Sequence, residues 1–313
     1  MSKPESGSKL QSITSVGTIA IMLIVDSTFF IFARLLQQYL PAQQSTFYMM
    51  GTGTLMVVIY AAIKKRLRFR ILCENLGFFM LIGFLVALST NLNYEAMAFI
   101  DPGTASLLNQ STIVFGLFWG LVWLHEKLNR RQGIGALIAI VGVIIITFQK
   151  GDYLRLGSLL VLISSLSYSF HSAVVKKYGD RFDFLEFFAF RLICNCFFLF
   201  LMVIFTTGLS LPPAPVWPLL LFAAAVEVCI SRPLYYLVLR KYPFSILSIL
   251  LTLSPILTVV WALILFGTIP TWIQLIGGLG IIAGVLVMAG FPARLRKPVQ
   301  EEKPVPEEIV RVL

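Results

Sequence analysis

Two stretches are apolar at every position, LIAIVGVIII at residues 137–146 and FFLFLMVIF at residues 197–205. A strand of a membrane barrel alternates apolar and polar residues with a period of two, and neither stretch does so. A helix closes its backbone hydrogen bonds internally, so it can be apolar on all sides and still lie in lipid or against other helices. The two stretches therefore predict helices of a membrane protein.

The whole chain has the same character. Of its 313 residues, 58% are hydrophobic and 13% are charged, whereas an ordinary soluble domain is about 45–50% apolar and about 25% charged. The surplus apolar surface is expected to face the lipid bilayer. The formal net charge of +10 does not predict nucleic-acid binding, because the basic residues form short clusters between apolar runs and not one basic face.

Charge clusters, prolines and glycines divide the chain into ten runs that are long enough to cross a membrane, since about 20 apolar residues cross ~30 Å of hydrocarbon. The expected spans are residues 13–37, 43–63, 72–97, 102–124, 132–149, 157–176, 184–207, 216–240, 244–267 and 271–290. Residues 1–12 are expected to be a cytoplasmic segment. Residues 291–313, rich in Glu, Lys and Pro, are expected to be a disordered cytoplasmic tail.

The positions of Lys and Arg predict that both termini are cytoplasmic, since short cytoplasmic loops carry an excess of these residues. With ten spans and the N-terminus inside, twenty of the 25 basic residues fall inside. Only Lys150 and Arg155 fall outside, and Arg34, Arg191 and Arg232 lie within spans. A missed span would destroy this alternation, so the charges also support the even number of spans.

The two halves of the chain resemble each other. Tyr94 precedes Pro102 by eight residues, and Tyr235 precedes Pro243 by eight. Three further sets of residues recur at offsets of 140 to 142: Gln132-x2-Gly135-x6-Gly142-Val143 as Gln274-x2-Gly277-x6-Gly284-Val285, Gly17 and Ser27 as Gly157 and Ser167, and Phe30 and Ala33 as Phe170 and Ala173. The chain is therefore predicted to contain two repeats, residues 13–150 and 151–290.

Each repeat has five expected spans, and an odd number makes the second repeat enter the membrane from the opposite side. The loop charges agree, because KKRLRFR at residues 64–70 corresponds to the uncharged LSLPPAPVWP at residues 209–218. The predicted fold is an all-α membrane protein of ten transmembrane helices in two inverted five-helix repeats. Secondary transporters often use this plan, with the substrate near the midplane between the repeats.

This duplicated unit resembles the EamA-like family of the drug/metabolite transporter superfamily. Residues 94–146 and 236–267 are similar to parts of that family's repeat, and the resemblance spans residues 17–290. It implies ten helices and a central cavity lined mainly by helices 3, 4, 8 and 9, with contributions from 1 and 6. It also implies transport of small metabolites, often amino acids, across a plasma membrane. The halves differ at three positions typical of the family: Val114 against Pro255, Glu126 against Gly267, and Met50 against Arg191.

Charged residues inside the expected spans are the first candidates for a substrate site. A charge deep in a span costs at least ~2.5–3.5 kcal/mol, so it is expected to face a cavity or a partner. Asp26 and Arg34 lie eight residues apart in the first span, about two turns, and so on nearly the same face. Alternatively, both form structural pairs, or Arg34 extends toward the outer surface.

The eighth span carries Glu227 and Arg232, which a five-residue spacing keeps on different faces of an α-helix. Arg232 precedes Pro233, which favours a kink, and Tyr235 follows. Arginine binds carboxylate or phosphate through a two-pronged donor geometry, so Arg232 is expected to hold a substrate carboxylate. The alternative is that Glu227 and Arg232 neutralise each other or Asp26.

Polar residues and one histidine extend the candidates. His171, among serines in the sixth span, suits interhelical hydrogen bonding or, alternatively, a proton relay. Amides commonly hold helices together, which is the alternative role for Asn91 and Gln110. A central cavity is predicted to be lined by Asp26, Arg232 and Tyr235, with His171 and Gln110 nearby. The full set of expected substrate-binding residues is Asp26, Arg34, Asn91, Tyr94, Gln110, His171, Glu227, Arg232 and Tyr235.

Other features narrow the function. The chain has no P-loop motif for ATP, and its two histidines, His125 and His171, exclude a His-rich metal site. No cofactor is expected, and the four cysteines are expected to be small buried hydrophobic residues. Gly116-x3-Gly120 and Gly280-x3-Gly284 favour close packing within the monomer, with a homodimer seam as the alternative.

The sequence therefore predicts a secondary transporter and no enzyme. Its expected substrate is a small polar metabolite, such as an amino acid or a related carboxylate or zwitterion. It would cross a plasma membrane, in a bacterium the inner membrane, by alternating access. Nucleotide-linked sugars or organic phosphates are the alternative substrates. A passive channel and an intramembrane enzyme are the alternative functions, but only isolated acids and histidines occur, and an enzyme would need them to converge.

Overall fold

A computed structural model describes residues 17–125, 129–147, 156–235 and 251–289, and no strand occurs in these ranges. Eight helical segments are long and apolar enough to cross a membrane. Two shorter apolar helices follow them, Ser254–Phe266 and Trp272–Met288. These findings confirm a multi-pass helical membrane protein. The count of ten spans stays a prediction, because the expected ninth span is described only from Leu251 onward.

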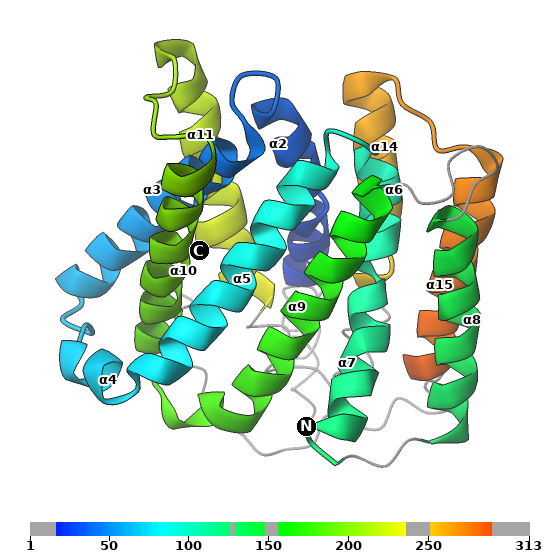
Figure 1. Ribbon diagram of the computed structural model, residues 1–313, viewed down its shortest axis with the longest axis horizontal. Helices are drawn as coiled ribbons and strands as arrows, with labels where there is room; N and C mark the ends of the chain where they lie inside the picture. Colours follow the sequence, from blue (N-terminus) through cyan, green and yellow to red (C-terminus); the bar gives the residue numbers. More distant parts are fainter. Residues whose placement is uncertain (1–16, 126–128, 148–155, 236–250, 290–313) are drawn as a thin grey trace, which may run out of the picture.

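The helices follow the expected spans closely (Figure 1). The first span, Gly17–Leu36, ends with α2 (Phe29–Leu36), and the eighth, Ala214–Tyr235, contains a π-helical segment, η3. In chain order the further elements are α3 (Ala42–Ile63), α4 (Phe69–Glu74), α5 (Leu76–Ala96), α6 (Pro102–Asn109), α7 (Ser111–Val122), α8 (Arg130–Thr147), α9 (Leu156–Tyr178), η1 (Gly179–Arg181), α10 (Phe184–Thr206), η2 (Ala214–Val216), α11 (Trp217–Ala224), η3 (Ala225–Ser231), α14 (Ser254–Phe266) and α15 (Trp272–Ala289).

Two helix beginnings show why these residues start helices where they do. Asp101 precedes Pro102, and its carboxylate accepts a hydrogen bond of 2.8 Å from the backbone N–H of Thr104. Asp183 accepts in the same way from the N–H of Leu185 at 3.2 Å. The first turn of a helix leaves backbone N–H groups without intrahelical partners, and an aspartate before that turn satisfies one of them.

The helices pack mainly in pairs. The α3 helix lies against α10, α6 against α14, and α8 against α15, while α5 contacts both α9 and α10. Figure 1 shows α8 and α15 together at one edge of the molecule, with α3 and α10 near the other. The largest buried apolar cluster joins α2, α3, α5, α6, α9, α10 and α11. This central packing positions the polar residues described below.

The repeated glycine motif forms the contact between α8 and α15. A Cβ atom on Gly142 would lie 2.5 Å from the carbonyl oxygen of Gly277, and one on Gly135 would lie 2.5 Å from that of Gly284. Gly280 also faces α8, where its Cβ would meet the Cα of Gly142 at 3.3 Å. Close packing within the monomer was expected of two motifs, and it is found for Gly280 and Gly284, whereas a Cβ atom on Gly116 of the other motif would meet no atom within 4 Å. Small residues are needed here because the two backbones touch.

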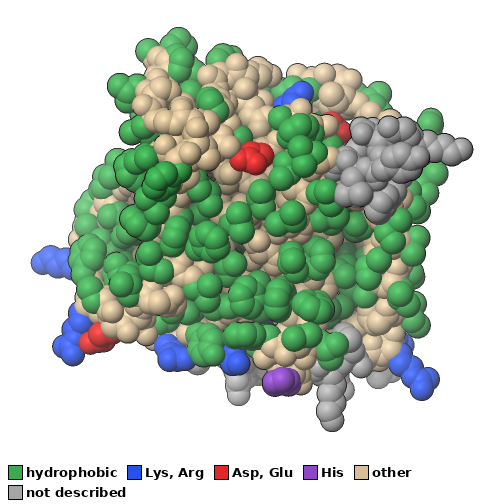
Figure 2. All heavy atoms as spheres, in the orientation of Figure 1, with side chains coloured by type: hydrophobic (Ala, Val, Ile, Leu, Met, Phe, Trp, Pro, Cys, Tyr) green, Lys and Arg blue, Asp and Glu red, His purple; other side chains and the backbone are tan. Residues whose placement is uncertain are grey.

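The outer surface suits lipid. Figure 2 shows hydrophobic side chains over most of one face, with most of the visible Lys and Arg side chains along the lower edge. Two contacts place basic segments at the same end of the molecule: Lys177 at the end of α9 lies 5.0 Å from the Trp123 ring after α7, and Arg68 before α4 binds Glu186 in α10. This clustering is the pattern expected of a cytoplasmic surface, and the orientation itself stays a prediction.

One expectation about the cysteines is wrong. Cys73 is exposed, because the apolar run that begins at Leu72 is interrupted: α4 ends at Glu74 and α5 begins at Leu76. The short α4 thus lies outside the bundle. Cys194 is buried, as expected, and Cys196 and Cys229 are partly buried.

The exposed Cys73 offers a direct test of topology. A membrane-impermeant maleimide should leave Cys73 unlabelled in intact cells and should label it after permeabilisation, because its neighbours Arg68 and Arg70 belong to the basic loop expected inside. The variant Leu211→Cys, in the exposed segment after α10, serves as the control and should be labelled in intact cells. Ready labelling of Cys73 in intact cells would contradict the orientation.

Candidate functional site

Three of the eight candidate spans are irregular near their middles, and a turn also directly precedes α14. The first span has a turn at Ser27 and Thr28, and the fourth is divided into α6 and α7 at Gln110. The eighth contains η3, and a turn at Thr252 and Leu253 precedes α14. Irregular backbone at membrane depth is tolerated only where protein or a water-filled cavity surrounds it. In secondary transporters, such broken helices carry the substrate site.

The turn in the first span has a local cause. The Ser27 hydroxyl donates a hydrogen bond of 2.7 Å to the carbonyl of Ile24, and the Thr28 hydroxyl lies 2.6 Å from that of Val25. Serine and threonine side chains that bind preceding carbonyls compete with the helical backbone hydrogen bonds. Two such residues in succession therefore loosen the helix directly after Asp26.

This turn is tied to α14. The Ser254 hydroxyl donates to Asp26 Oδ2 at 2.8 Å, and the Thr258 hydroxyl donates to the carbonyl of Ser27 at 2.9 Å. The indole N–H of Trp261 donates to Ser27 Oγ at 3.2 Å. The carboxylate of Asp26 is partly buried. It thus lies where the first span crosses the beginning of α14.

The same turn is tied to η3. The Thr28 hydroxyl, which lies close to the carbonyl of Val25, also lies 2.9 Å from Glu227 Oε1. Glu227 is only 1% exposed, and its other oxygen, Oε2, has no hydrogen-bond partner among the described residues. A buried carboxylate oxygen without a donor is costly. This oxygen is therefore a place where a ligand or a proton would be stabilised.

The backbone around Glu227 is not a regular α-helix, because η3 covers Ala225–Ser231 and Arg232 follows it directly. In π-helical backbone, hydrogen bonds join residues five apart, so residues at this spacing lie closer in direction than they do on an α-helix. The charges of Arg232 and Asp26 both act on Glu227. The Arg232 guanidinium lies 5.9 Å from the centre of the Phe29 ring.

Tyr94 and His171 complete the group. Tyr94 is fully buried, its ring meets Phe29 edge to face at 5.7 Å, and its hydroxyl has no hydrogen-bond partner within the described ranges. Both ring nitrogens of buried His171 likewise lack a described partner. The charge of Arg232 acts on both side chains. We call these five residues the central cluster: Asp26, Tyr94, His171, Glu227 and Arg232.

The remaining candidates have other surroundings. The Gln110 amide donates to the carbonyl of Leu251 at 3.0 Å and so joins the break in the fourth span to the segment before α14. The Arg34 guanidinium donates to the carbonyl of Met97, at the end of α5. Asn91 donates to Glu95 Oε1 at 2.9 Å. The Asn91–Glu95 bond lies within α5, and the contact of Asn91 with another helix is the bond of 3.3 Å that its Oδ1 accepts from the Thr46 hydroxyl of α3. None of these contacts reaches a residue of the central cluster.

Tyr235 packs against a small apolar cluster that contains Leu23 and Leu234. Sequence reasoning missed Thr28 and Ser254, which bind the two carboxylates of the central cluster. The sequence singled out Ser27 only because it recurs in the second repeat. Nothing in the sequence distinguished the neighbouring Thr28 as a ligand of Glu227. In the described part of the chain, no three His, Cys, Asp or Glu side chains come together as a metal site would require.

The EamA-like transporter family matches the chain twice, over residues 14–148 and 155–290. The chain belongs to this family. The uncharacterized transporter YdfC of Bacillus subtilis (strain 168) is 23% identical to this chain in an alignment of 194 residues that covers 58% of the chain and 60% of YdfC. A solved crystal structure of a protein superposes with a TM-score of 0.61 at 15% identity, over 86% of this chain and 94% of its own. That likeness concerns the fold alone. The family is one of transporters, and the match covers about 60% of the length of the curated relative.

Proposed function

We propose that this transporter moves a small polar metabolite with a carboxylate, an amino acid or a related zwitterion, across the plasma membrane by alternating access. The observation that carries the proposal is the central cluster. It combines two carboxylates and a guanidinium, at the irregular parts of the first and eighth spans, with polar atoms of α5 and α9 that have no described partner. A buried polar atom left unpaired costs about 1–3 kcal/mol, so a polar ligand would be bound favourably here.

The roles follow from charge. Arg232 holds the substrate carboxylate through its paired N–H donors. Asp26 accepts the amino group or a proton, and Glu227 beside it accepts the same kind of donor at Oε2. Tyr94 and Phe29 supply aromatic surface next to these charges. Without an ATP-binding motif, the transport is driven by the substrate gradient, by exchange or by proton coupling.

The packing of the helices supports an inverted repeat. The pairs α3 with α10, α6 with α14, and α8 with α15 join expected spans 2 and 7, 4 and 9, and 5 and 10. Each pair therefore matches a span with its counterpart five spans later, as a twofold axis between two five-helix repeats requires. We propose that this axis lies in the membrane plane, with both termini cytoplasmic, so that rocking of the repeats exposes the central cluster to either side.

Organic phosphates, including nucleotide-linked sugars, are the second candidate substrates. The observation that favours them is the presence of two guanidinium groups, those of Arg191 and Arg232, whose charges both act on His171. A doubly charged phosphate would be suited to two cations. The two carboxylates nearby, Asp26 and Glu227, favour a zwitterion instead, because they would repel a phosphate. We propose no chemical reaction for this protein.

Purified protein in liposomes tests the proposal. Uptake of labelled amino acids, dicarboxylates and sugar phosphates should reveal one saturable carboxylate-bearing class. Arg232→Gln should reduce its transport on the order of 30-fold, because it removes the charged donors that the proposal assigns to the substrate carboxylate, and hydrogen bonds to charged groups contribute about 1.5–3 kcal/mol. The exposed Arg70, paired with Glu74 at 2.7 Å on the surface, supplies the control variant Arg70→Gln, which should transport normally.

The double variant Asp26→Asn with Arg232→Gln separates substrate binding from a structural role. If both residues contact substrate, transport stays lost while the protein inserts and remains monodisperse. If the two charges only orient helices, removing both should restore much of the folding and transport that either single change removes. Recovery in the double variant would therefore refute the proposed roles.

A further inference from the structure

The α3 and α10 helices carry the same contact at each of their two ends. Residues 42–63 of α3 and 184–206 of α10 begin 142 positions apart and have nearly equal lengths. The segment that follows α3 reaches the first turn of α10, and the segment that follows α10 reaches the first turn of α3. The helices are therefore antiparallel neighbours, and each end of their interface is tied by a side chain from a connecting segment.

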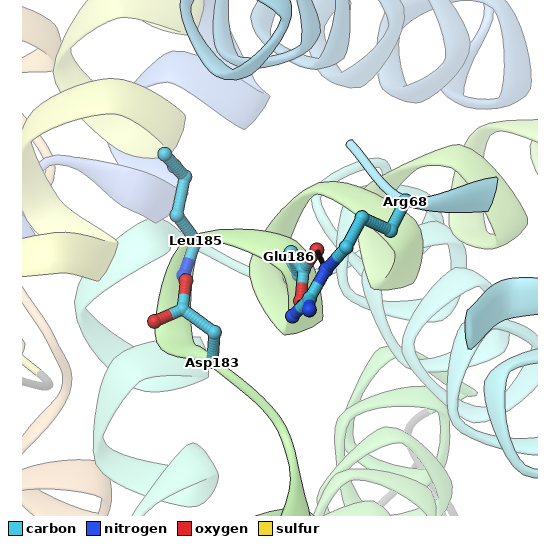
Figure 3. A network of polar contacts seen from close by, with 4 residues as sticks. All are labelled: Arg68, Asp183, Leu185 and Glu186. Atoms are coloured by element: carbon cyan, nitrogen blue, oxygen red, sulfur yellow. Dashed lines mark hydrogen bonds and ion pairs between the residues drawn. The ribbon is translucent and has the colours of Figure 1, made fainter. Parts of the chain in front are cut away.

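The first tie is an ion pair (Figure 3). Arg68, just before α4, donates to Glu186 through Nε at 2.6 Å and through Nη2 at 2.7 Å. The Glu186 side chain is only 1% exposed, whereas that of Arg68 is 68% exposed. The hydrogen bond to Glu186 and the charge of its carboxylate raise the pKa of the Arg68 guanidinium. Arg68 therefore covers a buried negative charge from the solvent side.

The second tie is neutral. The Ser210 hydroxyl donates to Gln44 Oε1 at 2.9 Å, and the Gln44 amide donates to the carbonyl of Gly208 at 3.0 Å. The Tyr48 hydroxyl adds a bond of 2.8 Å to the carbonyl of Ser210. Like Glu186, Gln44 is almost fully buried, at 3% exposed. A buried acceptor in α3 is thus covered by a segment that follows α10.

The two ties occupy equivalent positions. Glu186 and Gln44 are each the third residue of their helix, and they lie 142 positions apart. Arg68 and Ser210 are also separated by 142 positions. Both contacts join one predicted repeat to the other. The repeat architecture has therefore produced one contact twice, with charged residues at one end of the interface and neutral residues at the other.

We propose that Arg68–Glu186 and Ser210–Gln44 are the two gates of the transport cycle. When the protein is open to one side of the membrane, the gate on that side is broken and the other gate is intact. This inference rests on the proposed alternating access. A rocking motion about the α3–α10 contact separates the helices at one end at a time, so the tie at that end must break. The tie at the opposite end stays closed and prevents a continuous pore.

The chemistry makes the two gates unequal. Hydrogen bonds between a guanidinium and a carboxylate are about twice as strong as neutral ones. Opening the Arg68 gate would also leave the buried Glu186 without its cation. Aromatic packing supports that end, where Phe78 stacks on Phe182 at 5.4 Å and Phe79 meets Phe190 at 5.7 Å. The resting protein therefore opens more readily at the Ser210 end.

Accessibility of a reporter cysteine tests the gates without knowledge of the substrate. The reporter Ser231→Cys lies beside the central cluster in η3, in full-length protein in which Cys194, Cys196 and Cys229 are alanine. A charged methanethiosulfonate is applied to sealed vesicles of each orientation, and native Cys73 on α4 identifies the Arg68 face. Arg68→Gln should raise the reporter's labelling rate from that face, on the order of fivefold to tenfold. Arg70→Gln removes only a surface ion pair and should not change it.

An exchange of the gates keeps the test decisive if Arg68→Gln folds poorly. Gln44→Glu with Ser210→Arg adds an ion pair at the other end and leaves Arg68–Glu186 in place, so labelling from the Ser210 face should fall by a similar factor. Arg68→Ser with Glu186→Gln makes both gates neutral and should bring the two labelling rates together. Unchanged rates in both exchanges overturn the gates and leave alternating access intact. Simultaneous access to the wild-type reporter from both faces indicates a pore and overturns both proposals.

Discussion

Replacement of Glu227 by glutamine is expected to abolish transport while the protein still inserts and remains monodisperse. Glutamine keeps the size of the side chain and an oxygen that can lie near the Thr28 hydroxyl, 2.9 Å from Oε1 in the native protein. It removes the acidic oxygen Oε2, which has no hydrogen-bond partner among the described residues and which could otherwise bind a substrate cation or carry a proton. Hydrogen bonds to charged groups contribute about 1.5–3 kcal/mol, so the transport rate should fall on the order of 100-fold.

The rate is measured in proteoliposomes with the substrate identified for the wild-type protein. Glu74→Gln is the matched control, because it makes the same chemical change in an exposed carboxylate that pairs only with Arg70, and it should retain full activity. Normal transport by Glu227→Gln would show that this carboxylate neither binds substrate nor carries a proton. The substrate site would then have to lie elsewhere among the irregular helices.

The sequence was sufficient for the helices, since long apolar runs and the alternation of basic loops depend only on local composition. It also singled out Asp26, Tyr94, His171, Glu227 and Arg232 as candidates, because polar groups within a span are costly and therefore conspicuous. It predicted one cavity for Asp26, Arg232 and His171, but it did not place Glu227 and Tyr94 beside them. Their association depends on which helices are neighbours, and that is decided by packing between residues far apart in the chain.

The local geometry of the site was also beyond prediction. The eighth span was expected to kink at Pro233 but to be α-helical at Glu227, whereas the structure has the π-helical η3 at Ala225–Ser231. A π-helical segment has no distinctive amino-acid composition, so the sequence did not predict it. The turn at Ser27 and Thr28 did have a local cause, in their hydroxyl bonds to preceding carbonyls.

The repeated glycines also show that a sequence motif can be recognised while its contact partner cannot. Their spacing revealed two copies of one motif, but a spacing cannot reveal a partner. In the structure the two copies of the motif pack against each other, since Gly142 faces Gly277 and Gly135 faces Gly284. The motif therefore serves to hold the fifth expected span against the tenth. Its recurrence at a fixed offset reflects a contact that uses the same residues from both sides.

This contact predicts a large loss of stability in Gly142→Ala. The new Cβ would lie 2.5 Å from the carbonyl oxygen of Gly277 and 2.7 Å from the backbone nitrogen of Ile281. Backbone atoms cannot rotate away as a side chain can, so α8 and α15 must separate along their length. Overpacking of a core usually costs 1–3 kcal/mol, and a clash between two backbones is expected to cost about 3 kcal/mol or more.

Gly133→Ala is the matched control on the same helix, because its Cβ would meet no atom within 4 Å. Alanine is the better helix former by about 1 kcal/mol, so this variant should be as stable as the wild type or more so. Thermal unfolding of both variants in detergent, followed by the monodisperse fraction on size exclusion, measures the difference. Equal melting temperatures for Gly142→Ala and Gly133→Ala would mean that α8 and α15 do not meet through these glycines. A lower melting temperature for Gly142→Ala alone ties the repeated motif to the contact between the two halves.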